Sequence, residues 1–230
     1  MHGILLVDKP LGWTSFDAVN KVRRFIEAAG LNDTGRKRFP VGHTGTLDPM
    51  ATGLLVLLLG KDTRRAPELT KLDKTYLVTM HLGQTSTTGD SEGELTVVST
   101  AQPELRDIQD LLDKTVGPGM QTPPQYSAIK VNGQRAYKLA RAGKEVKLEP
   151  RPVTIKRLQL LGYSYPEVQF VAEVSSGTYI RSLVEDFGKA LGTGAYMSAL
   201  RRTEVGEFNI SNAVSPENLT AETIQEHLIV

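Results

Sequence analysis

The stretch GHTGTLDPMATG, residues 42–53, leads directly into the apolar run LLVLLL, residues 54–59, in a sequence of 230 residues. The run predicts a buried strand. Three glycines, a proline and several small residues force a sharp backbone path before it, which is costly unless the fold or a ligand requires it. Asp48 is the only acidic residue of the stretch, and Pro49 biases its backbone toward an extended conformation. The residues alone leave two interpretations open: a functional loop carrying Asp48, or a surface turn in which Asp48 bonds its own backbone.

Hydrophobic periodicity predicts many short strands and a few helices. Residues 74–82 alternate, with Tyr76, Val78 and Met80 on one side. Thr14 and Asp17 have the spacing of a helix start. The predicted strands are 3–8, 54–59, 74–82, 127–131, 153–161, 168–174 and 195–208, with a hairpin turn at 132–133. The predicted helices are 14–30 (Phe16, Val19, Val22 and Ile26 inward), 103–116 (Leu105, Ile108, Leu111 and Leu112 inward), 134–141, 179–191 and 221–229.

Strands and helices do not alternate strictly, which favours an α+β fold with a mixed, mostly antiparallel sheet flanked by helices. We expect one domain over residues 1–230, with an insertion at roughly 123–151.

Composition excludes several classes of function. The chain is 40% hydrophobic and 23% charged, as in ordinary globular proteins. It has no cysteine, which excludes disulfides, iron–sulfur clusters and thiol nucleophiles. Its four histidines are scattered, so we expect no metal site, and neither a phosphate-binding loop nor a Gly-x-Ser-x-Gly motif is complete. The N-terminus does not look like a signal peptide and residues 54–59 are too few to cross a bilayer, so we expect a soluble, cytoplasmic protein.

The near-neutral total charge conceals an uneven distribution. There are 27 basic and 26 acidic residues, a net charge of +1. Residues 130–157 hold nine basic and two acidic residues, a net +7, whereas residues 85–113 hold one basic and seven acidic residues, a net −6. A basic segment with Tyr137 in it and Tyr126 just before it suits a phosphate backbone.

Residues 42–53 resemble the catalytic motif of the TruB family of tRNA pseudouridine synthases. Other segments agree with that family in the same order, from about residue 3 to about residue 215: LVDKP (6–10) with Thr14 and Ser15, KTY (74–76), PPQYSAIK (123–130), GTYIRSL (177–183) and LRRT (200–203).

The resemblance implies the pseudouridine-synthase fold. It also implies that the chain isomerises the uridine at position 55, in the T-loop of tRNA, to pseudouridine and needs neither a cofactor nor a metal. It implies that Asp48 acts as nucleophile or proton acceptor and that Arg181 is the cation that keeps this carboxylate ionised. Tyr76 would stack on the extruded base and is a candidate for the proton-abstracting base. Tyr179 and Leu200 would line the pocket, and His43 would occupy the space that the base leaves.

The resemblance also implies that region 123–151 is an RNA-gripping insertion. We expect the RNA backbone to contact Lys130, Arg135, Lys138, Arg141 and Arg202. The expected partner is the T-arm of tRNA, with no membrane and with the chain acting as a monomer. Members of the family often carry a C-terminal PUA domain, which we do not expect here. The loop 32–40, with Arg36, Lys37 and Arg38, is longer than the family leads us to expect.

Simpler interpretations compete with these roles. Tyr76 could be a core tyrosine, and Arg181 an exposed helix residue paired with Glu185. The chain could be an RNA-binding or RNA-folding module without catalysis, or a relative that depends on a guide RNA. A different uridine-modifying enzyme is a further alternative, although methylation at C5 typically uses a cysteine, which this chain lacks.

Overall fold

The chain divides into two compact units in the computed structural model, which describes residues 1–127, 129–131, 133–136, 139 and 148–230. Unit 1 consists of Met1–Tyr76 and Leu200–Val230, and unit 2 of Leu77–Ala199. Along the chain, strands β4 (Lys74–Leu82) and β12 (Ala195–Val205) each pass from one unit to the other.

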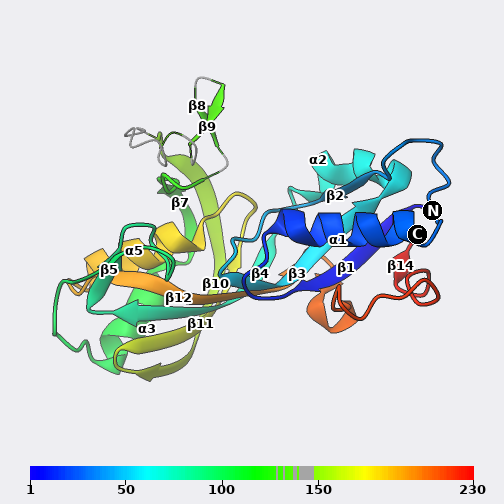
Figure 1. Ribbon diagram of the computed structural model, residues 1–230. Helices are drawn as coiled ribbons and strands as arrows, with labels where there is room; N and C mark the ends of the chain where they lie inside the picture. The colour runs from blue at the N-terminus through cyan, green and yellow to red at the C-terminus, as the bar shows by residue number, and fades with distance from the viewer. Residues whose placement is uncertain (128, 132, 137–138, 140–147) are drawn as a thin grey trace. The chain divides into compact units, whose positions relative to one another are not determined.

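Unit 1 is built on the apolar run that follows the loop 42–53. Strand β3 (Ala51–Leu59) pairs in antiparallel with β1 (Gly3–Lys9) and β2 (Val41–His43), which Figure 1 labels. It pairs in parallel with β12, where Leu200 lies opposite Ala51. The further elements of unit 1 are α1 (Ser15–Ala28), η1 (Gly60–Arg65), α2 (Ala66–Leu69), β13 (Phe208–Asn209), η2 (Ile210–Asn212) and β14 (Leu228–Ile229).

Both faces of β3 are buried, which explains why its sequence shows no alternation. Leu55, Leu57 and Leu59 pack into one apolar cluster with helix α1, whereas Leu54, Val56 and Leu58 pack into a second cluster with Leu69 and Phe208. Burying each such side chain contributes about 1.5–3 kcal/mol. The strand therefore fixes the C-terminal end of the loop that carries Asp48.

Helix α1 begins where the sequence predicts. The Thr14 hydroxyl accepts the Asp17 N–H at 3.1 Å, and the Asp17 carboxylate accepts the Thr14 N–H at 2.8 Å. This reciprocal capping box satisfies two backbone donors at the helix start.

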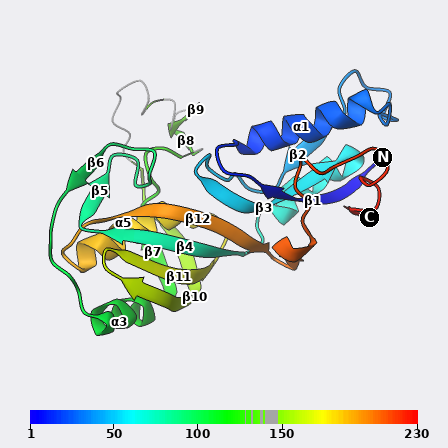
Figure 2. The same ribbon diagram turned by 60° about the horizontal axis from the view of Figure 1, so that its bottom comes forward.

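Unit 2 holds the strand order β12-β4-β11-β10-β7, and Figure 2 shows β12, β4, β11 and β10 side by side. The rings of Phe170 on β11 and Phe187 on α5 lie 5.9 Å apart in its core. The elements other than β4 and β12 are β5 (Gln84–Ser86), β6 (Leu95–Val97), α3 (Leu105–Thr115), β7 (Gly117–Gln121), β8 (Lys130–Val131), β9 (Gln134–Arg135), β10 (Arg151–Ser164), β11 (Glu167–Val174) and α5 (Ile180–Ala190).

The predicted α+β class with a mixed, mostly antiparallel sheet is confirmed. Strand β4 has the predicted bounds and alternation. Strands β8 and β9 pair in antiparallel on either side of the predicted turn, of which residue 132 lies outside the described residues. The single-domain prediction is not tested by the division into two units.

Several local predictions are wrong. Residues 221–227 form turns instead of a helix, and β14 after them pairs with β1. The helix predicted over 134–141 does not begin at 134, because Gln134–Arg135 form strand β9; Ala136 and Leu139 are helical, and the other residues of that segment lie outside the described ones. Phe16 and Leu105 lie in the first turns of their helices and are 63% and 58% exposed, so neither points inward.

Candidate active site

The peptide before Asp48 is held by one buried hydroxyl. Ser15 Oγ accepts the Leu47 N–H at 2.7 Å and donates to the Leu47 carbonyl at 3.0 Å. At Asp48 and after it, two further hydrogen bonds hold the backbone. The Gly12 N–H donates to the Pro49 carbonyl, and the Ala51 N–H donates to the Asp48 carbonyl. The Asp48 side chain is half-buried. The loop thus carries a half-buried aspartate on a backbone that is hydrogen-bonded on both sides.

Arg202 supports the same loop from strand β12. Its Nε donates to the Leu54 carbonyl at 2.7 Å and its Nη2 to the Gly45 carbonyl at 3.1 Å. The side chain is 2% exposed. The expectation that Arg202 contacts the RNA backbone therefore needs correction, because its guanidinium is buried and satisfies loop carbonyls.

Gly53 allows the backbone of Arg202 to lie close to the start of strand β3. Its φ is +104°, and a Cβ there would overlap the backbone nitrogen and carbonyl oxygen of Arg202. A side chain at this position would meet both backbone strain and a collision.

His43 and Lys74 are two further titratable groups beside this loop. Burial, followed by the charge of Arg202, lowers the pKa of His43, and its Nδ1 accepts the Gly45 N–H at 3.3 Å. His43 is therefore neutral at pH 7. Burial, with the charge of Arg202 as a smaller cause, lowers the pKa of Lys74 to about 8. The Lys74 Nζ donates to the carbonyls of Thr70 and Leu72.

Tyr76 and Leu200 stand on strands of the same unit. Tyr76 is 8% exposed and lies on the buried face of β4, as its alternation predicts. Leu200 is half-buried opposite Ala51. Unit 1 therefore holds four of the residues predicted for catalysis and for the pocket, His43, Asp48, Tyr76 and Leu200.

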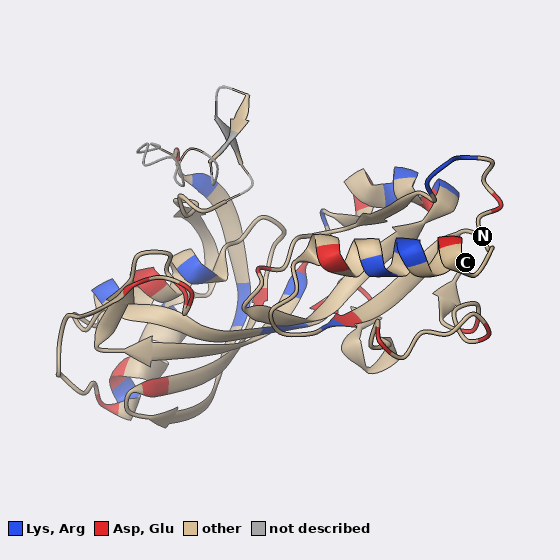
Figure 3. Ribbon diagram, viewed as in Figure 1, with Lys and Arg blue, Asp and Glu red and all other residues tan. Residues whose placement is uncertain are grey.

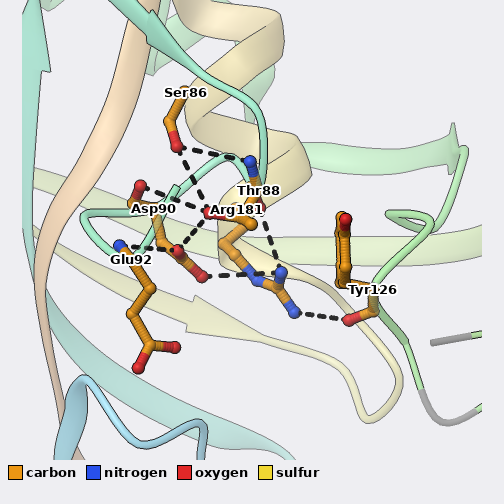
Figure 4. A network of polar contacts seen from close by, with 6 residues as sticks. All are labelled: Ser86, Thr88, Asp90, Glu92, Tyr126 and Arg181. Carbon is orange, nitrogen blue, oxygen red and sulfur yellow. Dashed lines mark hydrogen bonds and ion pairs between the residues drawn. The ribbon is translucent and has the colours of Figure 1, made fainter. Parts of the chain in front are cut away.

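Arg181 belongs to unit 2 and is buried in a polar network at the start of helix α5. Its Nη1 donates to the Thr88 carbonyl at 3.0 Å and lies 3.5 Å from the Asp90 carboxylate (Figure 4). Its Nη2 donates to the Tyr126 carbonyl at 2.8 Å. The side chain is 6% exposed. The alternative of an exposed helix arginine is therefore wrong.

Asp90 is itself positioned by its own turn. It is 2% exposed, and its Oδ1 accepts the Thr88 hydroxyl and the Glu92 N–H (Figure 4). The Asp90 carboxylate thus fixes the guanidinium of Arg181, since a buried pair keeps its orientation only when its remaining lone pairs are also satisfied.

Tyr179 lies two residues before Arg181 and is half-buried. Its N–H donates to Gln121 Oε1 at 2.8 Å, and its carbonyl accepts Gln121 Nε2 at 3.0 Å. Ser182 Oγ donates to the Thr122 carbonyl at 2.9 Å. The start of α5 is therefore bound to the end of strand β7.

The predicted RNA contacts of the insertion are only partly described. Lys130 and Arg135 lie opposite each other in the β8–β9 hairpin, of which only the backbone pairing is described. Lys138 and Arg141 lie outside the described residues. Arg36, Lys37 and Arg38 are exposed in the loop between α1 and β2 of unit 1 (Figure 3).

Sequence reasoning missed Ser15, Asp90 and Gln121 as supporting residues. Asp90 was counted only as one charge of the acidic segment, and its position after Gly89 in a tight turn was the available signal. Gln121 carried no local signal, because its partner is 58 residues away.

No helix within the described residues is long and apolar enough to cross a membrane. Across the same residues, His, Asp and Glu form no group of three or more that could hold a metal ion.

Two protein-family models match the sequence. TruB family pseudouridylate synthase (N terminal domain) matches residues 35–180, and tRNA pseudouridylate synthase B C-terminal domain matches residues 181–228.

Curated relatives match over most of the chain. A protein of Pseudomonas putida named tRNA pseudouridine synthase B is 46% identical over 219 residues, which cover 95% of this chain and 68% of the relative. A protein of the same name from Dechloromonas aromatica is 44% identical over 226 residues, covering 98% of this chain and 72% of the relative.

Solved structures share the fold. A chain of a Cbf5-Nop10-Gar1 complex is 29% identical with a TM-score of 0.72, and a chain of an H/ACA RNP bound to a substrate RNA containing 2'-deoxyuridine is 28% identical with a TM-score of 0.67. The match to the first covers 98% of this chain and 57% of the solved chain, and the match to the second covers 94% and 52%.

Proposed function

Because the chain belongs to the TruB family of pseudouridylate synthases, we propose that it isomerises uridine to pseudouridine in tRNA, at position 55 of the T-loop. The observation that carries this proposal is Asp48, half-buried on a loop whose backbone is hydrogen-bonded on either side. Its support comes from the family and from this geometry together.

The reaction needs an ionised carboxylate beside the sugar. The bond between N1 and C1′ breaks, the base turns, a bond between C5 and C1′ forms, N1 gains a proton and C5 loses one. We assign Asp48 the role of nucleophile or proton acceptor at this step. A loop that holds the carboxylate in place before the substrate arrives reduces the entropic cost of reaching the reactive geometry.

Extruding a stacked uridine costs a few kcal/mol, and stacking on an aromatic ring returns about 1–3 kcal/mol. We assign this stacking to Tyr76, with proton abstraction from C5 as its second role. Neutral His43 suits the space left by an uncharged base, because burying an imidazolium would cost more. Leu200 and Tyr179 are assigned to the lining of the pocket.

Arg181 is assigned as the catalytic cation. Its guanidinium donates to the carbonyls of Thr88 and Tyr126 and lies beside the Asp90 carboxylate. These contacts support a fixed orientation of the guanidinium. An arginine stays protonated at any working pH, so it supplies a constant positive charge.

We further propose that the substrate is recognised through its T-arm and that the chain acts alone as a monomer in the cytoplasm. The identity of 46% to a protein named tRNA pseudouridine synthase B supports tRNA as the substrate.

The test uses the purified chain, an unmodified T-arm RNA and no guide RNA. We expect pseudouridine at the T-loop position, none in an RNA with cytidine there, and none with Asp48→Asn. Asp110→Asn, an exposed carboxylate on α3, is the matched control and should keep the wild-type rate.

Three outcomes would count against the proposal in different ways. RNA binding without product at stoichiometric enzyme would favour a binding module. Product only after addition of a guide RNA would favour the guide-dependent alternative. Full activity of Asp48→Asn would remove the assignment of Asp48 alone.

A further inference from the structure

Gln121 is a buried glutamine whose amide pairs with the backbone N–H and carbonyl of a single residue, Tyr179. It ends strand β7, is 5% exposed, and uses both polar atoms of its side chain on the N–H and the carbonyl of Tyr179, at 2.8 and 3.0 Å. Two bonds from one planar amide fix the position of the Tyr179 backbone and its rotation.

Helix α5 needs such an anchor at its start. Tyr179 is the N-cap residue, with φ −101° and ψ 113°, and its own side chain makes no capping hydrogen bond. The Tyr179 N–H precedes the first helical turn and has no acceptor in the helix ladder, so Gln121 Oε1 satisfies it from outside. The direction in which the chain enters α5 is therefore set by Gln121.

The residues after Gln121 continue this attachment. The Thr122 carbonyl accepts Ser182 Oγ at 2.9 Å, and the Tyr126 carbonyl accepts Arg181 Nη2 at 2.8 Å, as Figure 4 shows for the latter. Along segment 121–126, Gln121, Thr122 and Tyr126 therefore bind Tyr179, Ser182 and Arg181 respectively. The same segment leads into the region 123–151, for which the sequence predicts RNA contacts.

We propose that Gln121 is a positioning residue of the reaction, which aligns Tyr179 and Arg181 and joins the base of the insertion to helix α5. The inference rests on the proposed function, since it assumes that these two residues serve catalysis. Gln121 acts through Tyr179 and touches no substrate.

A positioning role and a purely stabilising role predict different kinetics. Misplacing a catalytic group by about 1 Å can cost about 100-fold in rate while the RNA is still bound by the rest of the surface. Loss of Gln121 should therefore lower the single-turnover rate at saturating RNA and leave the Kd for the RNA nearly unchanged.

The experiment compares two substitutions of Gln121 with a matched control. Gln121→Met keeps the length of the side chain and removes both hydrogen bonds, whereas Gln121→Glu keeps the acceptor for the Tyr179 N–H and loses the donor. Gln169→Met places the same side chain at an exposed position of strand β11 in the same unit.

We expect Gln121→Met to reduce the single-turnover rate by about 10- to 100-fold, with Gln121→Glu in between and Gln169→Met at the wild-type rate. The Kd for the T-arm RNA should stay within about twofold for all three, measured below their unfolding temperatures. A wild-type rate for folded Gln121→Met, or a rate loss matched by an equal loss of affinity, would overturn the proposal.

Hydrogen exchange gives a readout that does not depend on activity. In the wild-type protein the Tyr179 amide should be protected like the amides of α5, and in the Gln121 variants it should exchange faster. Rapid exchange of this amide in the wild type would overturn the proposal even if the variants do not fold. If wild-type protein makes no pseudouridine but the exchange result holds, the proposed function fails while the anchoring of Tyr179 stands.

Discussion

Ser15 and Leu47 share two hydrogen bonds: one serine hydroxyl accepts the leucine N–H at 2.7 Å and donates to its carbonyl at 3.0 Å. The two residues are 32 positions apart, and Ser15 is 2% exposed. The first residue of helix α1 therefore determines the path of the peptide that precedes Asp48.

Replacing Ser15 by alanine should lower the free energy of unfolding by about 2 kcal/mol or more, because two buried backbone groups of Leu47 lose their partner. Urea denaturation measures this change. Ser211→Ala, at an exposed hydroxyl of the same unit, should stay within about 0.5 kcal/mol of the wild type. Equal stability of the two variants would contradict the role of Ser15.

Two glycines with positive φ, Gly12 and Gly53, separate two costs of a glycine-to-alanine substitution: backbone strain and collision of the new Cβ with neighbouring atoms. Gly12, at φ +81°, has open space where a Cβ would lie, whereas a Cβ on Gly53 would overlap Arg202. Gly12→Ala should therefore cost about 1–2 kcal/mol, the strain alone, and Gly53→Ala should cost clearly more. Thermal unfolding of both proteins measures the difference, and similar melting temperatures would speak against the close approach of Arg202.

Lys74 makes stability depend on pH in the alkaline range. Its folded pKa of about 8 lies below the ordinary value of 10.5, so between these values the unfolded chain binds more protons than the folded one. Stability should therefore rise with pH across this window, by at most about 1.4 kcal/mol per pH unit from this group.

The comparison with Lys74→Met isolates that contribution from other titrating groups. The wild type should gain stability relative to the variant as pH rises from 8 to 10.5, as measured by urea denaturation at several pH values. Parallel pH profiles for the two proteins would show that the ammonium is not destabilised by burial.

RNA affinity should fall steeply with salt although the whole chain carries a net charge of only +1. If Lys130, Arg135, Lys138 and Arg141 each neutralise one phosphate, the plot of log K against log salt should have a slope of about −3 to −4 from these residues. Lys138→Gln should reduce the slope by about 1, and Lys114→Gln on helix α3 should not change it. A flat salt response would contradict binding through the phosphate backbone.

The sequence predicted correctly those elements whose signals are local, such as alternating burial along a strand or a capping box at a helix start. Strand β4 alternates because one face is buried, and α1 begins at a capping box formed within four residues. The turns over residues 221–227 contradicted a helical pattern, since the adjacent β14 pairs with β1 at the opposite end of the chain. Pairing between distant segments leaves no periodic signal in either of them.

The same limit applies to the candidate site. The motif around Asp48 could be recognised, and family membership is established independently. The supporting contacts could not be recognised, because Arg181 has a nearby glutamate at i+4 in sequence but pairs with Asp90, far earlier in the chain. Arg202 likewise reads as a surface cation next to Arg201, and only the fold shows that it satisfies the carbonyls of Leu54 and Gly45.

The division of the chain has a consequence for its synthesis on the ribosome. Unit 2 is one uninterrupted segment, Leu77–Ala199, whereas unit 1 combines the first 76 residues with residues from Leu200 onward. Strand β3 is made early, but its parallel partner, the Leu200–Arg202 part of β12, emerges about 150 residues later. Strand β2, also made early, pairs with Leu57–Leu59 on the same edge of β3, so during the interval it is the Ala51–Gly53 part that lacks a native partner. An unpaired strand edge favours aggregation and chaperone binding. All residues of unit 2 are synthesised before Leu200, so unit 2 should fold on the nascent chain before unit 1 does.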